Sequence, residues 1–185
     1  MRLRGYDYTH PGYYFITICT YKMRMMFGIV EKGSMSLNSF GYEAKRCWLD
    51  LPNHYSCQID ACIVMPNHIH GIIIIPDRCD NIVSTTNVPA GLNPLVRGEM
   101  RSVQQYTNPL VHEEVNQQHS VSEIVRGFKT FSAAAVNKQR GSPGARLWMR
   151  SFHDHIIRSV DDIERVREYI RLNPSKWNKD SKNLG

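Results

Sequence analysis

The sequence predicts an α+β domain in which helices pack on an antiparallel sheet. Runs rich in β-branched and aromatic residues alternate with amphipathic helical segments, in the order strand, hairpin, helix, strand, strand, helix, strand, helix. Short turn signals separate neighbouring strands. The chain has 185 residues, of which 42% are hydrophobic, which is enough for one globular domain with a core. We therefore expect a single domain over residues 1–185.

The first part of the chain supplies a strand, a hairpin and a helix. Residues 13–21 (YYFITICTY) have the composition of a strand. Residues 27–30 and 34–37 flank a turn that contains a glycine, which favours a hairpin. Asn38, or the serine after it, can cap a helix that runs to about residue 51. The side chains expected to face inward from this helix are Tyr42, Cys47, Trp48 and Leu51.

Two further strands meet at a tight turn. Residues 57–65 form the first strand, and Met65-Pro66-Asn67 forms the turn. The four isoleucines at 72–75 form a buried run that Pro76 closes, so we expect two antiparallel neighbours. Alternation predicts that one face of the first strand carries Ile59, Ala61 and Ile63.

Residues 77–119 interrupt this pattern. The stretch is rich in proline, glycine, asparagine and serine and has no sustained period, so we expect a flexible insertion.

Two helices and an extended element follow the insertion. Ser120-Val121-Ser122-Glu123 has the pattern of a capping box that opens a helix. Residues 146–157 are expected to be extended. A second cap at Ser159 opens a helix over residues 161–172, which stops before Pro174. The expected inward side chains are Ile124, Val125, Phe128, Phe131, Ala135 and Val136 in the first helix, and Ile163, Val166 and Ile170 in the second.

Charge and cysteine content bound the functional class. The net charge is +6, which suits a polyanionic partner without proving one. The five cysteines contain no C-x-x-C pair and are odd in number, so we interpret them as reduced packing residues of a cytoplasmic protein. The N-terminal residues lack a signal-like apolar run, and the longest apolar runs are too short to cross a bilayer. We therefore expect no membrane partner.

The sequence His68-Ile69-His70 directly before the isoleucine run is a candidate metal site. On a strand, His68 and His70 project from one face while Ile69 points to the other. Neutral imidazole is a good ligand for divalent metals. An isolated His-x-His is more often a polar surface pair, and only a partner elsewhere in the chain gives this one weight.

Tyr169 and Asn173 are that candidate partner, because they lie one turn apart on the last helix. Tyr169 could be a nucleophile if a nearby cation helps its weakly acidic phenol, and the Asn173 amide oxygen could be a third ligand. Two imidazoles with oxygen ligands favour Mg²⁺ or Mn²⁺. Taken alone, Tyr169 could equally be an edge packing residue and Asn173 an ordinary helix stop.

Two segments carry a family resemblance. IDACIVMPNHIHGIIII resembles the motif of the HUH endonucleases, and FHDHIIRSVDDIERVREYIRLNPSKW resembles the C-terminal part of the single-tyrosine transposases, especially the REP-associated tyrosine transposases. The resemblance covers most of the chain outside residues 77–119. It implies a ferredoxin-like α+β fold. It also implies Tyr169 as the nucleophile and His68, His70 and Asn173 as ligands of the metal.

The same resemblance implies an activity and its partners. The expected enzyme is a transposase that nicks and rejoins single-stranded or hairpin DNA through a 5′-phosphotyrosine, with Mg²⁺ or Mn²⁺ and no nucleotide cofactor. Relatives of this kind act as homodimers or as monomers.

Six further residues are candidates for DNA contacts. Asp154 and His155 resemble an acidic-histidine step of the REP-associated branch, against which stands a solvated strand edge. The basic residues could contact phosphates, although each alone is more simply a solvated surface charge. The six are Arg150, Asp154, His155, Arg158, Arg165 and Lys176.

Two other functions stay open at this level. One is a catalytically inactive DNA-binding module descended from such a transposase. The other is a histidine-based metallohydrolase of small substrates, which usually needs additional Asp or Glu ligands.

Overall fold

The computed structural model describes residues 6–77, 119–180 and 182–183. The expected flexible insertion at 77–119 lies outside the described residues except for its two end positions. In the part of the chain that is described, no helix combines the length and apolar character needed to span a bilayer.

A four-stranded antiparallel sheet forms the centre of the fold. Its strands are β1 (Gly12–Cys19), β4 (Gln58–Met65), β5 (His68–Ile75) and β6 (His153–Ile157), in the order β4-β5-β1-β6. Helix α1 (Ser39–Leu49) lies between β1 and β4 in sequence, and α3 (Val121–Gln139) lies between β5 and β6. This order of elements and strands is ferredoxin-like, which confirms the predicted fold class.

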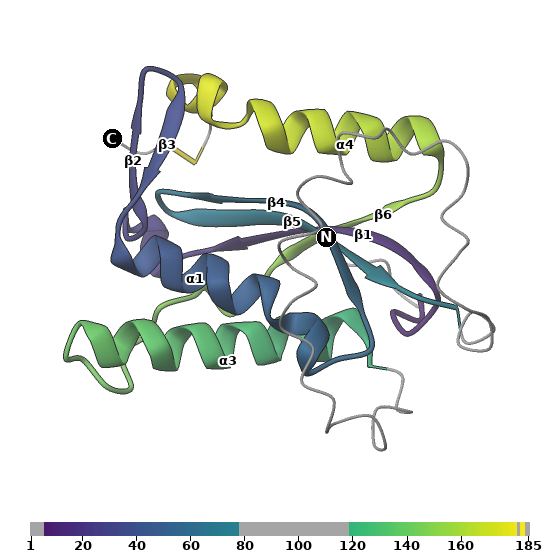
Figure 1. Ribbon diagram of the computed structural model, residues 1–185, viewed down its shortest axis with the longest axis horizontal. Coiled ribbons are helices and arrows are strands. Elements are labelled where there is room, and N and C mark those ends of the chain that lie inside the picture. Colours follow the sequence, from purple (N-terminus) through teal and green to yellow (C-terminus); the bar gives the residue numbers. More distant parts are fainter. Residues whose placement is uncertain (1–5, 78–118, 181, 184–185) are drawn as a thin grey trace. The chain divides into compact units, whose positions relative to one another are not determined.

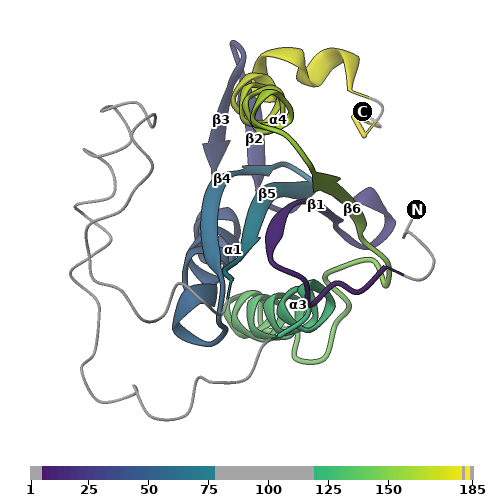
Figure 2. The same cartoon turned by 90° about the vertical axis from the view of Figure 1, so that its right-hand side faces the viewer.

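Helices cover both faces of the sheet. Figures 1 and 2 show α1 and α3 on one face and α4 (Val160–Leu172) on the other. The larger core lies under α1 and α3 and takes Ile69 and Ile73 from β5. A smaller apolar cluster, made of Ile72, Ile157, Ile163 and Ile170, lies under α4. The alternation of β5 therefore directs its odd-numbered residues to the large core and its even-numbered ones towards α4.

Gly71 allows β5 to pack tightly against α1. A Cβ atom at this position would lie 2.5 Å from Cζ2 of Trp48, a distance that no ordinary contact allows. Trp48 is fully buried, so the glycine beside His70 is required by packing rather than by backbone conformation.

A separate two-stranded hairpin joins the sheet to α1. It consists of β2 (Gly28–Glu31) and β3 (Ser34–Leu37), and Gly33 takes the positive φ of 75° that its turn needs. A short 3₁₀ turn, η1 (Tyr21–Met23), precedes it, and another, η5 (Pro174–Lys179), follows α4.

The predicted helix starts are confirmed by their hydrogen bonds. Asn38 accepts from the backbone N–H of Gly41, and Ser159 accepts from that of Asp162. Ser120 and Glu123 form both halves of the capping box. Each cap satisfies N–H groups that the helix itself cannot pair.

Two predicted core residues are wrong. Tyr42 is 64% exposed on α1, and Phe131 is 46% exposed on α3, where its ring lies 5.4 Å from that of His54. The sequence pattern predicts both side chains to be buried, because they are aromatic and lie near the apolar stripe of their helix. Both side chains instead lie on the solvent-exposed faces of their helices, and single exposed aromatic residues are common on protein surfaces.

The predicted common face of Ile59, Ala61 and Ile63 is also wrong. A register shift between Ile59 and Cys62 interrupts the pairing of β4 with β5. Ile59 consequently packs against the large core, while Ala61 and Ile63 pack against the cluster under α4. An irregularity of this kind reverses the alternation of side chains on one side of it.

Only the second half of the predicted extended element at 146–157 is a strand. Within the loop before β6, Trp148 makes a single bridge to Thr20. The carbonyl groups of Met149, Arg150 and Ser151 accept from the ammonium of Lys129 at 3.0–3.2 Å. A side-chain donor thus satisfies backbone groups that a sheet ladder would otherwise pair.

Candidate active site

The two histidines lie side by side on the central strand β5, under α4. Their rings are 0% and 1% exposed for His68 and His70. The two Nε2 atoms are 3.0 Å apart, and both rings lie on the face of the sheet opposite to Ile69. The expectation that the pair shares one face is confirmed.

Each ring is held at its other nitrogen. Nδ1 of His68 lies 2.8 Å from Oδ1 of Asn67, in the turn before β5. Nδ1 of His70 lies 2.8 Å from Oγ1 of Thr17, its cross-strand neighbour on β1. Both Nε2 atoms are thereby aimed at a common point, which is how histidine ligands are usually oriented.

Burial keeps both rings neutral. Desolvation lowers the pKa of His68 to about 3 and holds the pKa of His70 well below its ordinary value. A neutral imidazole has one nitrogen lone pair free for a cation, so the pair is in the protonation state that metal binding needs.

Tyr169 of α4 reaches over this pair. Its hydroxyl lies 3.5 Å from Nε2 of His70, and its ring packs edge-on against the rings of His70 and Phe15. The side chain is 39% exposed, so the hydroxyl is accessible from outside the fold. Burial and then the charge of Asp180 raise the pKa of the phenol, whereas a hydrogen bond from Asn173 lowers it.

Asn173 ends α4 one turn beyond Tyr169. The side chain is 3% exposed and its Oδ1 is a buried oxygen with no hydrogen-bond partner among the described residues. Buried polar atoms are rarely left unpaired, so this amide oxygen can accept a hydrogen bond or bind a cation. The ring of Trp177, in η5, lies 5.9 Å from that of His68.

These residues fit a divalent metal. Two imidazole nitrogens and one amide oxygen form a mixed donor set that Mn²⁺ or Mg²⁺ accepts. Across the described ranges there is no group of three or more His, Cys, Asp or Glu side chains that could hold a metal. Among the described residues near the histidine pair, the Asn173 amide is the side chain that adds an oxygen donor to this set.

An ion pair positions α4 on the sheet. The guanidinium of Arg167 donates to both carboxylate oxygens of Asp60 on β4, with the shortest distance 2.6 Å, and also pairs with Glu164. Together with Ile163 and Ile170, this contact sets the position of the helix that carries Tyr169.

The predicted step Asp154-His155 is divided between the two faces of β6. Asp154 accepts a 2.5 Å hydrogen bond from Tyr8, whereas His155 lies 3.0 Å from Asp162 on α4. Neighbouring strand residues point to opposite sides, so the two cannot act on one ligand from the same face.

The four basic candidates lie on the surface. All four are exposed: Arg150, Arg158, Arg165 and Lys176. Arg165 donates to the Asp161 carbonyl and lies close to Asp162. Within the described residues none of the six DNA candidates hydrogen-bonds to the histidine pair or to Tyr169.

Sequence reasoning missed Thr17, Asn67 and Trp177 as parts of the site. Asn67 directly precedes the His-x-His motif, and that adjacency was a usable signal. Thr17 is 53 residues from His70, and only the strand register brings the two together.

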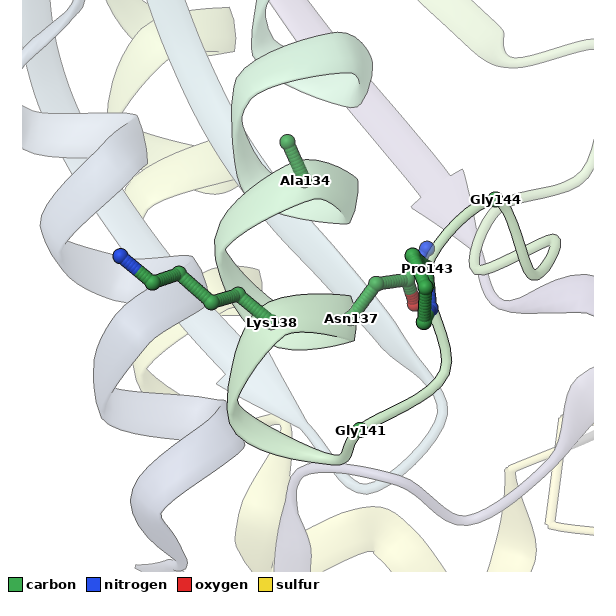
Figure 3. Close-up of a pocket in the computed structure, with 6 residues that line it drawn as sticks. All are labelled: Ala134, Asn137, Lys138, Gly141, Pro143 and Gly144. Carbon is green, nitrogen blue, oxygen red and sulfur yellow. The ribbon is translucent and has the colours of Figure 1, made fainter.

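A hollow elsewhere in the fold does not contain the site. It lies at the end of α3 and in the loop that follows, where Asn137 points towards that loop and Lys138 extends away from it (Figure 3). Asn137 donates to the carbonyl of Ala145, so its role is to hold this loop. The lining residues are Ala134, Asn137, Lys138, Gly141, Pro143 and Gly144.

The fold and the site together have the arrangement that a resemblance to the single-tyrosine HUH transposases implies. A His-x-His strand lies in the centre of a ferredoxin-like sheet, and a helix carries a tyrosine over it.

Comparison with known proteins agrees with this class. No family model matches the chain. Over 181 residues it is 32% identical to an uncharacterized protein of Haemophilus influenzae, which covers 97% of this chain and 89% of the relative. The chain belongs to one family with that protein. A second Haemophilus influenzae protein, named as a candidate REP-associated tyrosine transposase, is 21% identical over 170 residues, or 92% of this chain and 74% of the relative.

A solved structure shares the fold. The structure of a REP-associated tyrosine transposase bound to a REP hairpin matches with a TM-score of 0.54 at 17% identity, over 96% of this chain and 74% of that one. The chain thus resembles the REP-associated tyrosine transposases in sequence and in fold, as its two motifs predict.

Proposed function

We propose that this protein is a metal-dependent endonuclease and strand transferase for single-stranded DNA, with Tyr169 as its nucleophile. The observation that carries the proposal is the 3.5 Å approach of the Tyr169 hydroxyl to Nε2 of His70, on an otherwise buried pair of neutral imidazoles. An accessible phenol beside two preoriented metal-binding nitrogens suits phosphodiester cleavage.

In the reaction, the 5′-phosphate end of the cut DNA is transferred to the protein and later returned to a 3′-hydroxyl. The phenolic oxygen of Tyr169 bonds to the scissile phosphorus, and the bond from phosphorus to the 3′ oxygen breaks. The products are a 5′-phosphotyrosine and a free 3′-hydroxyl, so a later attack by a 3′-hydroxyl can rejoin the strands without a nucleotide cofactor. Because the pKa of Tyr169 is raised, its proton is still present at rest. The phenol releases this proton to solvent as the new bond forms, and the departing 3′ oxygen takes up a proton from solvent.

Three side chains are proposed to hold the cation. His68 and His70 would bind Mg²⁺ or Mn²⁺ through Nε2, and Asn173 would bind it through Oδ1. When bound, the cation supplies positive charge that stabilises the transition state at the phosphate. A hydrogen bond from Asn173 also lowers the pKa of the Tyr169 phenol, which favours loss of its proton.

Hairpin or single-stranded DNA is the proposed substrate. The net charge of +6 favours a polyanion. The structural relative with the same fold is described as bound to a REP hairpin. This likeness supports the proposal but leaves the recognised sequence to experiment.

Covalent capture tests the nucleophile. The full chain is incubated with a pool of 3′-labelled single-stranded oligonucleotides and Mn²⁺ and then separated on a denaturing gel. We expect a labelled protein–DNA adduct that mass spectrometry places on Tyr169, and none from Tyr169→Phe, which keeps the ring and loses only the hydroxyl. Excess chelator should abolish the adduct without abolishing DNA binding.

A matched control is Tyr42→Phe, which changes a more exposed tyrosine on the opposite layer. It should form the adduct at the wild-type level. An adduct on another tyrosine, or full adduct yield from Tyr169→Phe, would contradict the mechanism. DNA binding with no adduct from the wild type on any oligonucleotide would instead indicate a binding module.

A further inference from the structure

We infer that the two histidines are prepared differently: Asn67 fixes His68 with its proton on Nδ1, whereas Thr17 allows His70 to exchange between its two neutral forms. Asn67 and Thr17 are thus positioning residues for the metal site. This inference rests on the proposed function, because it treats His68 and His70 as metal ligands.

The orientation of the Asn67 amide is determined by its neighbours. Its Nδ2 lies 2.7 Å from the carbonyl of Lys182 and 3.3 Å from that of Met23. Carbonyl oxygens can only accept, so the amide nitrogen must face them and Oδ1 must face His68. Asn67 is fully buried, which leaves water no access to exchange these partners.

His68 is consequently held in one form. Oδ1 of Asn67 accepts a hydrogen bond at 2.8 Å, so the Nδ1 of His68 must carry the hydrogen. In a neutral ring the other nitrogen, Nε2, then carries the lone pair. That atom is directed at His70 and needs no rearrangement before it binds a cation.

His70 is in the opposite form when no cation is bound. The two Nε2 atoms are 3.0 Å apart, and two lone pairs cannot face each other at that distance. The Nε2 of His70 therefore carries a hydrogen and donates it to His68. Its Nδ1 has the lone pair and accepts from the hydroxyl of Thr17 at 2.8 Å.

Cation binding by both Nε2 atoms requires His70 to change. The hydrogen leaves Nε2 and a hydrogen is taken up at Nδ1, so the charge of the ring is unchanged. The Thr17 hydroxyl, which donated to Nδ1, now accepts from it. A hydroxyl can serve both forms, whereas an amide oxygen or an aliphatic side chain cannot.

Nuclear magnetic resonance can observe the two forms directly. In the ¹⁵N-labelled full chain without metal, we expect His68 protonated on Nδ1 and His70 on Nε2, with signals assigned from His68→Gln and His70→Gln. Addition of Zn²⁺, a diamagnetic substitute for Mn²⁺, should move the His70 proton to Nδ1 and leave His68 unchanged. Protonation of His68 on Nε2 in the metal-free protein would overturn the inference.

Paired substitutions test the positioning residues. Thr17→Val has nearly the shape of threonine but no hydroxyl, and we expect it to bind Mn²⁺ about 10-fold or more weakly by calorimetry. Thr17→Ser should stay close to wild type, as should Thr130→Val, which alters an exposed threonine of α3. Wild-type Mn²⁺ affinity in Thr17→Val would refute the role of Thr17.

Asn67 is tested in the same way. Asn67→Leu removes the acceptor, and we expect it to release the preference of His68 for the proton on Nδ1. If Asn67→Leu does not fold, the wild-type spectrum and Thr17→Val still decide the inference. If the wild type shows both predicted protonated forms but binds no Mn²⁺, the proposed metal chemistry is wrong while the inference about the two forms stands. If it binds Mn²⁺ but shows other forms, the inference is wrong while the metal chemistry stands.

Discussion

At the scale of the residue, the site depends on two neutral imidazoles in the interior of the fold. His68 and His70 are buried, and each is bonded at Nδ1 to a polar side chain that is itself buried. Burial disfavours their charged forms, so the same desolvation that keeps them neutral for the proposed cation makes the native state sensitive to acid.

This sensitivity gives a prediction for stability against pH in the absence of metal. The pKa of His68 is about 3 in the native state against an ordinary 6.5, and the pKa of His70 is lowered in the same direction. Between these values the unfolded chain binds protons that the native state does not, so stability is full above about pH 6.5 and falls as the pH is lowered towards 3. The slope is at most about 1.4 kcal/mol per pH unit for each histidine.

Urea unfolding at several pH values between 7.5 and 4.5 measures this slope. A variant with asparagine in place of His68 and His70 should show a shallower decline of stability with falling pH, because the two buried imidazoles are gone. Its remaining histidines are the same as those of the wild type, so they cannot account for the difference. Parallel stability curves for the two proteins would show that the buried pair does not titrate as described.

Spacing in the sequence predicts part of this site but not its supports. The His-x-His pattern and the interval from Tyr169 to Asn173 are local, so periodicity places each pair on one face. Thr17 meets His70 only through the register of β1 with β5, which no local pattern encodes. The opposite directions of Asp154 and His155 follow from alternation and were predictable.

At the scale of the element, α4 packs on the smaller of the two apolar clusters. It contributes Ile163 and Ile170 to the minor apolar cluster and Arg167 to the ion pair with Asp60. The helix that carries the proposed nucleophile thus depends on one partly buried ion pair more than α1 or α3 does, since those two helices share the main core.

We predict that Asp60→Ala weakens this docking. The change removes three hydrogen bonds from the half-buried Arg167, for which we expect a loss of about 1–3 kcal/mol in the free energy of unfolding. Adduct formation by Tyr169 should fall more than DNA binding, because the phenol loses its fixed position. Chemical denaturation and the adduct assay measure the two effects.

The control for this prediction is Glu168→Ala, which removes an exposed partner of Arg171 on the same helix. It should leave stability and adduct yield unchanged, since exposed ion pairs contribute little. Equal losses in both variants would show that general helix charge, and not the contact with Asp60, is responsible.

Element boundaries were largely predictable because caps and turns are local. Asn38, Ser120 and Ser159 are short polar residues at the points where apolar periodicity begins, and each accepts a backbone N–H as expected. The irregularity in β4 was not predictable, since no glycine or proline marks it. It arises from how β4 pairs with β5, which is a tertiary property.

At the scale of the whole molecule, the excess of positive charge predicts how the affinity for the proposed DNA substrate depends on salt. Affinity for a single-stranded or hairpin oligonucleotide should fall about 10-fold or more as salt rises from about 50 to about 200 mM. Binding releases cations from the phosphates, and this release is less favourable at higher salt concentration. Fluorescence anisotropy with a hairpin and with a blunt duplex of equal length measures this. Affinity that is flat in salt, or equal for the two DNAs, would count against the proposed substrate.

The distance along the chain between the two halves of the site has a consequence for synthesis. The tyrosine is 99 residues beyond His70, so a ribosome that adds about 5–20 residues per second makes the histidine strand roughly 5–20 seconds before the nucleophile. During that interval the isoleucines that α4 will cover are exposed on one face of β5. The nascent chain therefore exposes apolar surface before Tyr169 exists, and the proposed site is complete only after α4 has packed on the sheet.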